Sequence, residues 1–283
     1  MRGAKTKRNI SGIIKTVLLF IFLALYITSF VLVLINSLKR KAEIIKFPLA
    51  LMDTQGFQFK NYATALDRMD FLQAFSNSII VTGLSILILL LFSSMAAYLF
   101  ARKDWKICKA SFSILLASMI LPFQVVMTPL ISIYGAQLNI INSLVTLIFM
   151  NIGFGLSLCT FMTHGFIKTS IPIALEEAAT IDGCTNFNCF IRIVFPLLKP
   201  ILSTISILEV LSIWNDYLLP SLVLRRKELY TLPIAIRTFY GTFSSDYGYI
   251  MAGLVMTIIP IIIVYVIFQR KIIGGVVAGA VKS

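Results

Sequence analysis

Long uncharged stretches alternate with short charged segments along the chain. Residues 16–38, 71–101 and 247–269 carry no Asp, Glu, Lys or Arg. A helix that crosses a bilayer needs about 20 apolar residues, so each stretch is long enough to cross once. Residues 110–167 are also uncharged, and at about 1.5 Å per residue they are too long for a single crossing.

The turn residues between Tyr134 and Ser143 divide this longest stretch into a third and a fourth helix. Pro122 and Pro129 fall inside the third helix, where each leaves backbone groups that need other partners in lipid, so we expect a kink or close packing. A fifth helix is expected from Ile201 to Leu222. The pattern predicts an all-α polytopic membrane protein with six transmembrane helices.

One long polar segment, residues 171–200, does not read as a membrane crossing. Glu176 and Glu177 lie early in a short helix, where the helix dipole favours negative charge. Gly183 suits the left-handed conformation that often follows a helix end. A second amphipathic stretch follows, and Pro196 is expected to end it. The apolar positions of the two predicted helices are Ala174, Ala178 and Ile181, then Phe187, Phe190, Ile191 and Val194.

Composition supports the membrane assignment. The 283 residues are 58% hydrophobic and 13% charged, whereas a soluble domain has about 25% charged residues. The net charge of +13 raises the question of nucleic acid, but the basic residues flank the apolar runs, which suits lipid headgroups and membrane topology. The four cysteines and the single His164 do not have metal-site spacing, so free thiols are expected and neither a metal site nor a cofactor is predicted.

The sequence does not support catalytic chemistry. It contains no GxxxxGK motif followed by Ser or Thr, so it lacks the usual cradle for ATP phosphates. Glu176, Glu177 and Asp182 form a carboxylate cluster, but their place at a short helix explains them without chemistry. Two functions remain, a passive pore-forming subunit and a self-contained carrier driven by an ion gradient. A carrier normally needs ionisable residues within its spans and often has inverted repeats; here Glu209 is the main candidate and no repeat is evident.

The spacing of the polar segment resembles a known motif. Glu177-Ala178-Ala179 is followed after three residues by Gly183, and after nine more by Ile193-Val194-Phe195-Pro196. This resembles the EAA loop of permease subunits of binding-protein-dependent ABC importers, with Phe195 where Leu is usual. Other motifs resemble the carbohydrate branch of that family, in particular the maltose-type second permease: Asn77-Ser78-Ile79, Ala97-Tyr98 with Arg102, Pro122 with Gln124 and Pro129, Trp214-Asn215-Asp216-Tyr217 with Pro220, and the terminal Gly279-Ala280-Val281-Lys282.

The resemblance implies a non-catalytic permease subunit in the plasma membrane of a bacterium or archaeon. Its expected partners are a second related permease, two ATP-binding cassette subunits, an extracytoplasmic solute-binding protein, a sugar and the bilayer. Residues 1–15 and 271–283 would be cytoplasmic ends, and residues 16–270 the permease domain. The count of Lys and Arg agrees modestly with this orientation, although Lys39-Arg40-Lys41 argue against it. The residues implied to couple to the ATPase are Glu176, Glu177, Ala178, Ala179, Asp182 and Gly183.

The fifth helix carries a polar stripe. Ser206, Glu209 and Asp216 fall near one helical face, with Trp214 and Asn215 bordering it. An ionisable residue within a span costs about 2.5–3.5 kcal/mol on insertion scales, so it usually faces protein or water. We predict that Glu209, Trp214, Asn215 and Asp216 line the translocation pathway. The alternative is that Glu209 pairs with a polar group of the partner permease.

Overall fold

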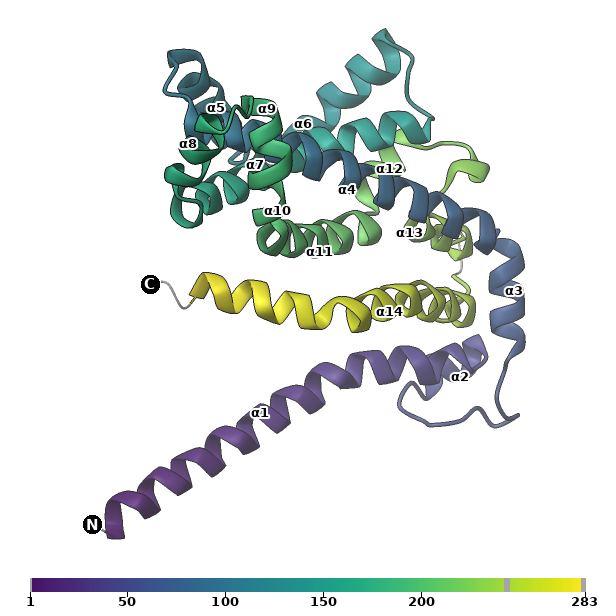
Figure 1. The fold of residues 1–283 in the computed structure, drawn as a ribbon. Coiled ribbons are helices and arrows are strands. Elements are labelled where there is room, and N and C mark those ends of the chain that lie inside the picture. The colour runs from purple at the N-terminus through teal and green to yellow at the C-terminus, as the bar shows by residue number, and fades with distance from the viewer. Residues whose placement is uncertain (1, 242–244, 281–283) are drawn as a thin grey trace. The chain divides into compact units, whose positions relative to one another are not determined.

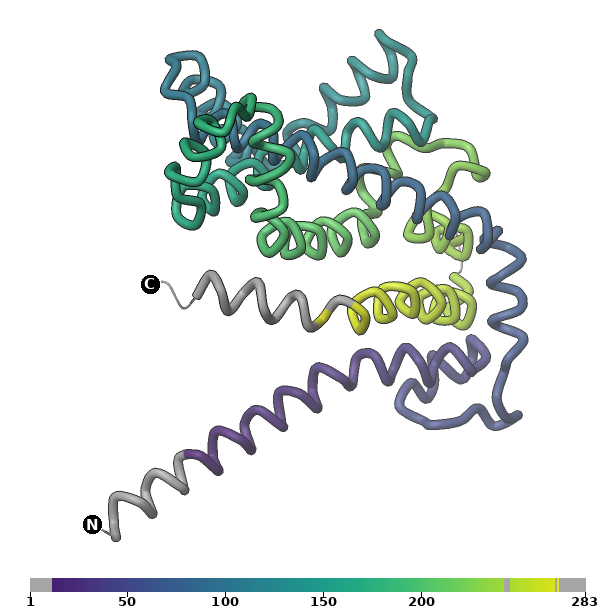
Figure 2. Tube along the Cα trace, in the orientation of Figure 1, coloured from purple at the N-terminus to yellow at the C-terminus, as the bar shows by residue number. Residues whose placement is uncertain are grey.

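The computed structural model describes residues 2–241 and 245–280, and over these residues the chain is helical (Figures 1 and 2). Extended pairing in this part of the chain is limited to one isolated bridge between Tyr240 and Ser245. The fold class predicted from sequence, all-α, is confirmed. Val281 and Lys282 of the C-terminal motif lie outside the described residues.

The first half holds α1 (Arg2–Ser37), α2 (Lys41–Lys46), α3 (Lys60–Arg68), α4 (Phe71–Arg102), α5 (Lys106–Ser118), α6 (Phe123–Leu130) and the π-helical η1 (Ile131–Gln137).

The second half begins with the long α7 and continues through shorter elements to α14. These are α7 (Leu144–Ser170), α8 (Ile173–Ile181), α9 (Asn186–Cys189), the π-helical η2 (Phe190–Val194), α10 (Phe195–Leu197), α11 (Lys199–Asn215), α12 (Leu218–Val223), the 3-10 turn η3 (Lys227–Leu229), α13 (Leu232–Ala235), the 3-10 turn η4 (Ile236–Phe239) and α14 (Tyr247–Ala280).

Four single helices are long and apolar enough to cross a membrane. They are Gly12–Ser37, Phe71–Arg102, Leu144–Ser170 and Tyr247–Ile267. Two further candidates are bent pairs, Lys106–Ser118 with Phe123–Gln137 at 99°, and Asn186–Leu197 with Lys199–Asn215 at 71°. The predicted total of six crossings is reached when each bent pair counts as one.

The predicted kink in the third crossing lies at Pro122. This residue precedes α6 with extended backbone, and the chain bends between α5 and α6. Pro129 lies inside α6, just before the π-helical η1. The predicted turn before α7 is also present, and Asn142 anchors it. Its backbone N–H donates to the Val223 carbonyl at 2.7 Å, and its side-chain Oδ1 accepts from the Arg225 N–H at 3.0 Å.

The predicted fifth helix, Ile201–Leu222, is wrong at its C-terminal end. α11 ends at Asn215, and α12 begins at Leu218. The side chain of Asp216 causes a new helix start, because its Oδ1 accepts from the Leu218 N–H at 2.9 Å and the Leu219 N–H at 3.4 Å. Asp is well suited to this use, since its short carboxylate satisfies amide groups that have no partner in the first turn.

The chain divides into two compact units. One contains residues 1–71 and 236–259, and the other contains residues 72–235 and 260–283. In the first unit, the segment between α1 and α4 contains α2 and α3. Asn61 on α3 donates from Nδ2 to the carbonyls of Ser37 at 2.8 Å and Lys39 at 2.9 Å. The buried Asp53 accepts from Nη2 of Arg40 at 2.7 Å, which closes the intervening loop.

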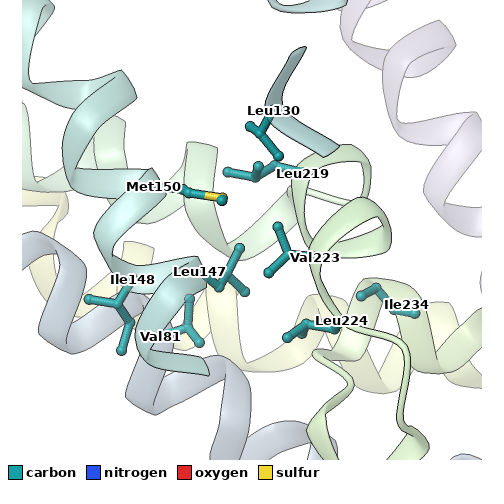
Figure 3. Close-up of a cluster of buried hydrophobic side chains, with 9 residues drawn as sticks. All are labelled: Val81, Leu130, Leu147, Ile148, Met150, Leu219, Val223, Leu224 and Ile234. Atoms are coloured by element: carbon teal, nitrogen blue, oxygen red, sulfur yellow. The ribbon is translucent and has the colours of Figure 1, made fainter. Parts of the chain in front are cut away.

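The second unit has two main apolar clusters. Figure 3 shows the first, in which side chains from α4, the α6 end, α7, α12 and α13 converge: Val81, Leu130, Leu147, Ile148, Met150, Leu219, Val223, Leu224 and Ile234. The second cluster packs the polar segment 171–200 against α4 and α7. Its buried members are Ala97, Ile167, Ile171, Ala179, Cys189, Phe190, Val194, Leu198 and Leu202. The segment is therefore an integral part of this unit.

Candidate functional site

The hairpin of residues 171–200 turns at Gly183, as predicted. Gly183 has φ +83°, a conformation that a residue with a Cβ adopts at a steric cost. Its N–H donates to the Thr180 carbonyl at 3.0 Å, and the Cys184 N–H donates to the Ala179 carbonyl at 2.9 Å. These two bonds form a Schellman motif, which ends α8 and reverses the chain.

α8 presents most of its predicted site residues outward. Glu177, Ala178 and Asp182 are exposed, and Ile181 is 86% exposed. Ala179 packs inward, at 7% exposed. Ala174 and Ala178 are exposed along with Ile181, so the apolar face predicted from their spacing is not buried within this chain.

The second helical stretch of the hairpin, Asn186–Leu197, ends one residue after Pro196, which was predicted to end it, and a 71° bend leads into α11. Pro196 lies in the first turn of α10. Proline is tolerated there because its missing N–H has no helical partner in a first turn. The predicted apolar face divides: Phe190 and Val194 are buried, whereas Phe187 is 61% and Ile191 40% exposed.

Glu176 differs sharply from its neighbour Glu177. Its carboxylate is turned toward the C-terminal end of α4, where Oε2 accepts from the Tyr98 hydroxyl at 2.9 Å and Oε1 from Nε of Arg102 at 2.8 Å. The side chains of Arg102 and Glu176 are only 10% and 12% exposed. Two adjacent acidic residues that look equivalent in the sequence therefore have different surroundings.

A groove of about 870 Å³ runs beside this hairpin. The end of α4 and the segment before α5 form one wall, and α8 with the start of α9 forms the other. The groove exposes both apolar and charged side chains, which suits an interface with a protein rather than a small polar ligand. Its lining includes Leu99, Lys103, Asp104, Trp105, Ile173, Glu177, Thr180, Ile181 and Asn186.

The second candidate site is a cavity of about 430 Å³ in the membrane-spanning part of the same unit. Glu209 of α11 lies in its wall and is 8% exposed. Its Oε1 accepts from the Cys159 thiol of α7, with a sulfur–oxygen distance of 3.4 Å. The lining combines polar and aromatic side chains: Phe123, Gln124, Asn151, Phe154, Gly155, Leu158, Glu209, Ser212, Ile213, Asp216, Leu218 and Leu219.

The structure brings only part of the predicted stripe to this cavity. Glu209 and Asp216 line it. Trp214 is buried and meets Phe75 edge to face at 6.1 Å between ring centroids. Asn215 is exposed and donates from Nδ2 to the Leu211 carbonyl at 2.8 Å. Trp214, five residues after Glu209, falls on a different side of α11, which has about 3.6 residues per turn. Helical spacing does not extend to Asp216, because α11 ends at Asn215.

Two residues of the cavity were not predicted from the sequence. Asn151 on α7 is 7% exposed, and its Nδ2 is buried without a hydrogen-bond partner among the described residues. Gly155, one turn further along α7, leaves room for the Glu209 carboxylate. The available signal was an Asn within an uncharged span, because a polar side chain there usually faces protein or water.

Other predicted features are placed as follows. His164 lies within α7, and its ring packs against that of Phe112 in a tilted arrangement, with 4.3 Å between ring centroids. The four cysteines are free thiols. Within residues 2–241 and 245–280, groups of three or more His, Cys, Asp or Glu side chains suited to a metal ion are absent.

Comparison with known proteins gives consistent results. Residues 89–276 match the model of the family described as binding-protein-dependent transport system inner membrane component. The chain is 39% identical to the probable starch degradation products transport system permease protein AmyC of Thermoanaerobacterium thermosulfurigenes, over 98% of this chain and 99% of the relative. It is 35% identical to the melibiose/raffinose/stachyose import permease protein MelC of Bacillus subtilis, over the full length of both.

Solved structures agree on the fold. A chain of a bacterial ABC transporter involved in the import of the acidic polysaccharide alginate superimposes with a TM-score of 0.75 at 23% identity, over 93% of this chain and 96% of that one. The ion-gradient carrier is not favoured by these relatives, and the predicted permease is confirmed as a multi-pass membrane protein. Both the family match and the full-length relatives lead to one assignment: the chain belongs to the family of binding-protein-dependent transport system inner membrane components, the permeases of ABC importers.

Proposed function

We propose that this chain forms half of the transmembrane pathway of an ATP-driven importer of sugars or oligosaccharides. The observation that carries the proposal is similarity over nearly the whole chain to two permeases named for starch degradation products and for melibiose, raffinose and stachyose. The uncharged spans and the hairpin at Gly183 are what such a subunit needs, a membrane body and an attachment point.

The proposed complex contains a second, related permease and two ATP-binding cassette subunits that hydrolyse the ATP. An extracytoplasmic solute-binding protein would deliver the sugar. A structural relative of this chain was solved in complex with an alginate pentasaccharide-bound periplasmic protein, which supports this part of the proposal. Both termini and the hairpin of residues 171–200 would lie in the cytoplasm.

The ATPase-facing surface would be the outward side of α8 and its turn. Glu177, Asp182 and Gly183 are exposed there, and Ile181 is 86% exposed. A nearly fully exposed Ile beside two carboxylates, in a groove lined by apolar and charged side chains, suits an interface in which an apolar side chain anchors the contact. Ala178 would allow close approach, and Ala179 would fix α8 to the permease body.

The cavity at Glu209 would be part of the translocation pathway. Sugars present hydroxyl groups and apolar ring faces, so a site for them needs acceptors, donors and aromatic surfaces. Glu209 and Asp216 supply acceptors, Asn151 supplies a donor without a described partner, and Phe123 and Phe154 supply aromatic surfaces. These features support passage of a hydrated, neutral solute through this part of the subunit.

Co-purification tests the coupling surface. Ile181→Asp would place a charge at the centre of the proposed contact, so the ATP-binding subunits should no longer co-purify with the permease pair. Phe57→Asp is the matched control, because Phe57 is 52% exposed on the segment between α2 and α3; it should leave the ATPase attached. Retention of the ATPase by Ile181→Asp would contradict the proposed surface.

A further inference from the structure

The two carboxylates that begin α8 are used differently, and Glu176 is fastened to the body of its own chain. Tyr98 and Arg102 occupy both of its oxygens, at 2.9 and 2.8 Å. Arg102 also donates from Nη2 to the Ile171 carbonyl at 2.7 Å, on the residue just before Pro172 and α8. Three hydrogen bonds therefore fasten the start of α8 to the last turn of α4.

The hydrogen bonds between α8 and α4 should resist separation of the two helices. The bonds between Arg102 and Glu176 join opposite charges, which makes them stronger than bonds between neutral groups. Both side chains are nearly buried, so loss of one partner would leave the other charge without compensation. Tyr98 adds a ring contact with Phe190 at 5.2 Å between centroids, which ties the same turn of α4 to the second half of the hairpin.

Packing along α4 connects Tyr98 and Arg102 with the cavity at Glu209. Ala97 and Tyr98 pack in the cluster that holds the hairpin. A third, smaller apolar cluster consists of Leu89, Cys159 and Ile205. Leu90 packs against both this cluster and the one that holds the hairpin. Arg102 and Leu89 are about 20 Å apart along the helix, from the rise of about 1.5 Å per residue. Leu89 touches the position of Gly155, directly beside Glu209.

We propose that Tyr98, Glu176 and Arg102 form a positioning joint that delivers movement of α8 to α4 and so to the wall of the Glu209 cavity. This inference rests on the proposed function. It assigns Glu176 to transmission within the permease and leaves Glu177 as the carboxylate available to the ATPase. Breaking the joint should leave the ATPase attached and active, while the accessibility of the cavity no longer changes with ATP.

Thiol labelling tests the joint without knowledge of the sugar. Ser212 lines the cavity and is exposed there, so Ser212→Cys provides a reporter in the complex with the second permease and the ATP-binding subunits. The probe is the cationic methanethiosulfonate MTSET, applied without nucleotide and with ATP plus vanadate. The same complex with Ser212 intact gives the background from the native cysteines. ATP hydrolysis and co-purification are measured on each sample.

The intact joint should give different labelling rates in the two nucleotide conditions. Arg102→Gln should make these rates equal while the ATPase co-purifies and hydrolyses ATP, and the exchanged pair Arg102→Glu with Glu176→Arg should restore a difference. Lys106→Gln removes an exposed charge at the start of α5 and should behave like the intact protein. An unchanged ATP response in Arg102→Gln, or loss of the ATPase from that complex, would overturn the joint. A missing response in the unaltered complex would instead count against the proposed function.

Discussion

Gly155 and Glu209 approach each other so closely that a Cβ built on the glycine would lie 3.3 Å from the carboxylate Oε2. The same Cβ would lie 2.7 Å from Cδ2 of Leu89. α4, α7 and α11 therefore meet at this point around one residue without a side chain. The approach explains why a carboxylate can be buried against α7, where it also accepts from the Cys159 thiol.

Gly155→Ala should destabilise the protein. The added methyl group must displace Leu89, and overpacking of this kind typically costs about 1–3 kcal/mol. Gly153→Ala is the matched control, because it lies on the same helix and its Cβ would meet no heavy atom within 4 Å. That variant should be neutral or slightly stabilising, since Ala favours the helix. Thermal unfolding in detergent compares the two, and equal melting temperatures would contradict the close packing at Gly155.

Gly183→Val should reduce the sugar imported per ATP hydrolysed. Its φ is +83°, and a Cβ there would meet nothing within 4 Å, so backbone strain of roughly 1–2 kcal/mol is the expected penalty. Gly183→Asn is the control, because Asn adopts positive φ more readily than other residues with a Cβ. It should keep most of the coupling. If both variants coupled like the unaltered protein, the left-handed turn would have no part in transmission.

Substitution of Glu209 separates a pathway role from an interface role. Glu209→Leu removes both charge and hydrogen bonding, and should impair transport while the complex still assembles and hydrolyses ATP. Glu209→Gln keeps the size and most hydrogen bonds, so its defect should be smaller. Assembly is followed by co-purification of the second permease. If Glu209→Leu dissociates the two permeases, the residue holds their interface and the pathway role is wrong.

Asp53 should make the stability of the first unit depend on acid pH. The hydrogen bonds from Arg40 hold the pKa of the Asp53 carboxyl well below its ordinary value. A depressed folded-state pKa contributes stability that is complete above the unfolded pKa of about 3.9 and is lost as pH falls through the folded value. Asp53→Asn should therefore lower the melting temperature at neutral pH, with a gap to the unaltered protein that narrows in strong acid. Asp67→Asn, at an exposed carboxylate, is the control, and a pH-independent gap would contradict the linkage.

Much of this architecture was predictable from the sequence, because membrane spans and the hairpin depend on local signals. Uncharged length located the spans, and a glycine between two apolar patterns located the turn at residue 183. Contacts between distant segments were not predictable. Neither the attachment of Glu176 to Tyr98 and Arg102 nor the space at Gly155 leaves a local pattern. Trp214 was misplaced although it lies within α11, because a residue five positions after Glu209 falls on a different side of a helix with about 3.6 residues per turn. Asp216 lies beyond the end of α11, where its side chain starts a new helix.

Uptake into proteoliposomes tests whether this chain takes part in ATP-driven sugar import. The vesicles would contain this chain, the second permease and the ATP-binding subunits, with the solute-binding protein and radiolabelled raffinose or maltotriose outside. Uptake should require ATP on the side of the ATP-binding subunits, should persist with a protonophore, and should disappear when this chain is omitted. Uptake by this chain alone, without ATP and abolished by the protonophore, would contradict the account and indicate an ion-gradient carrier.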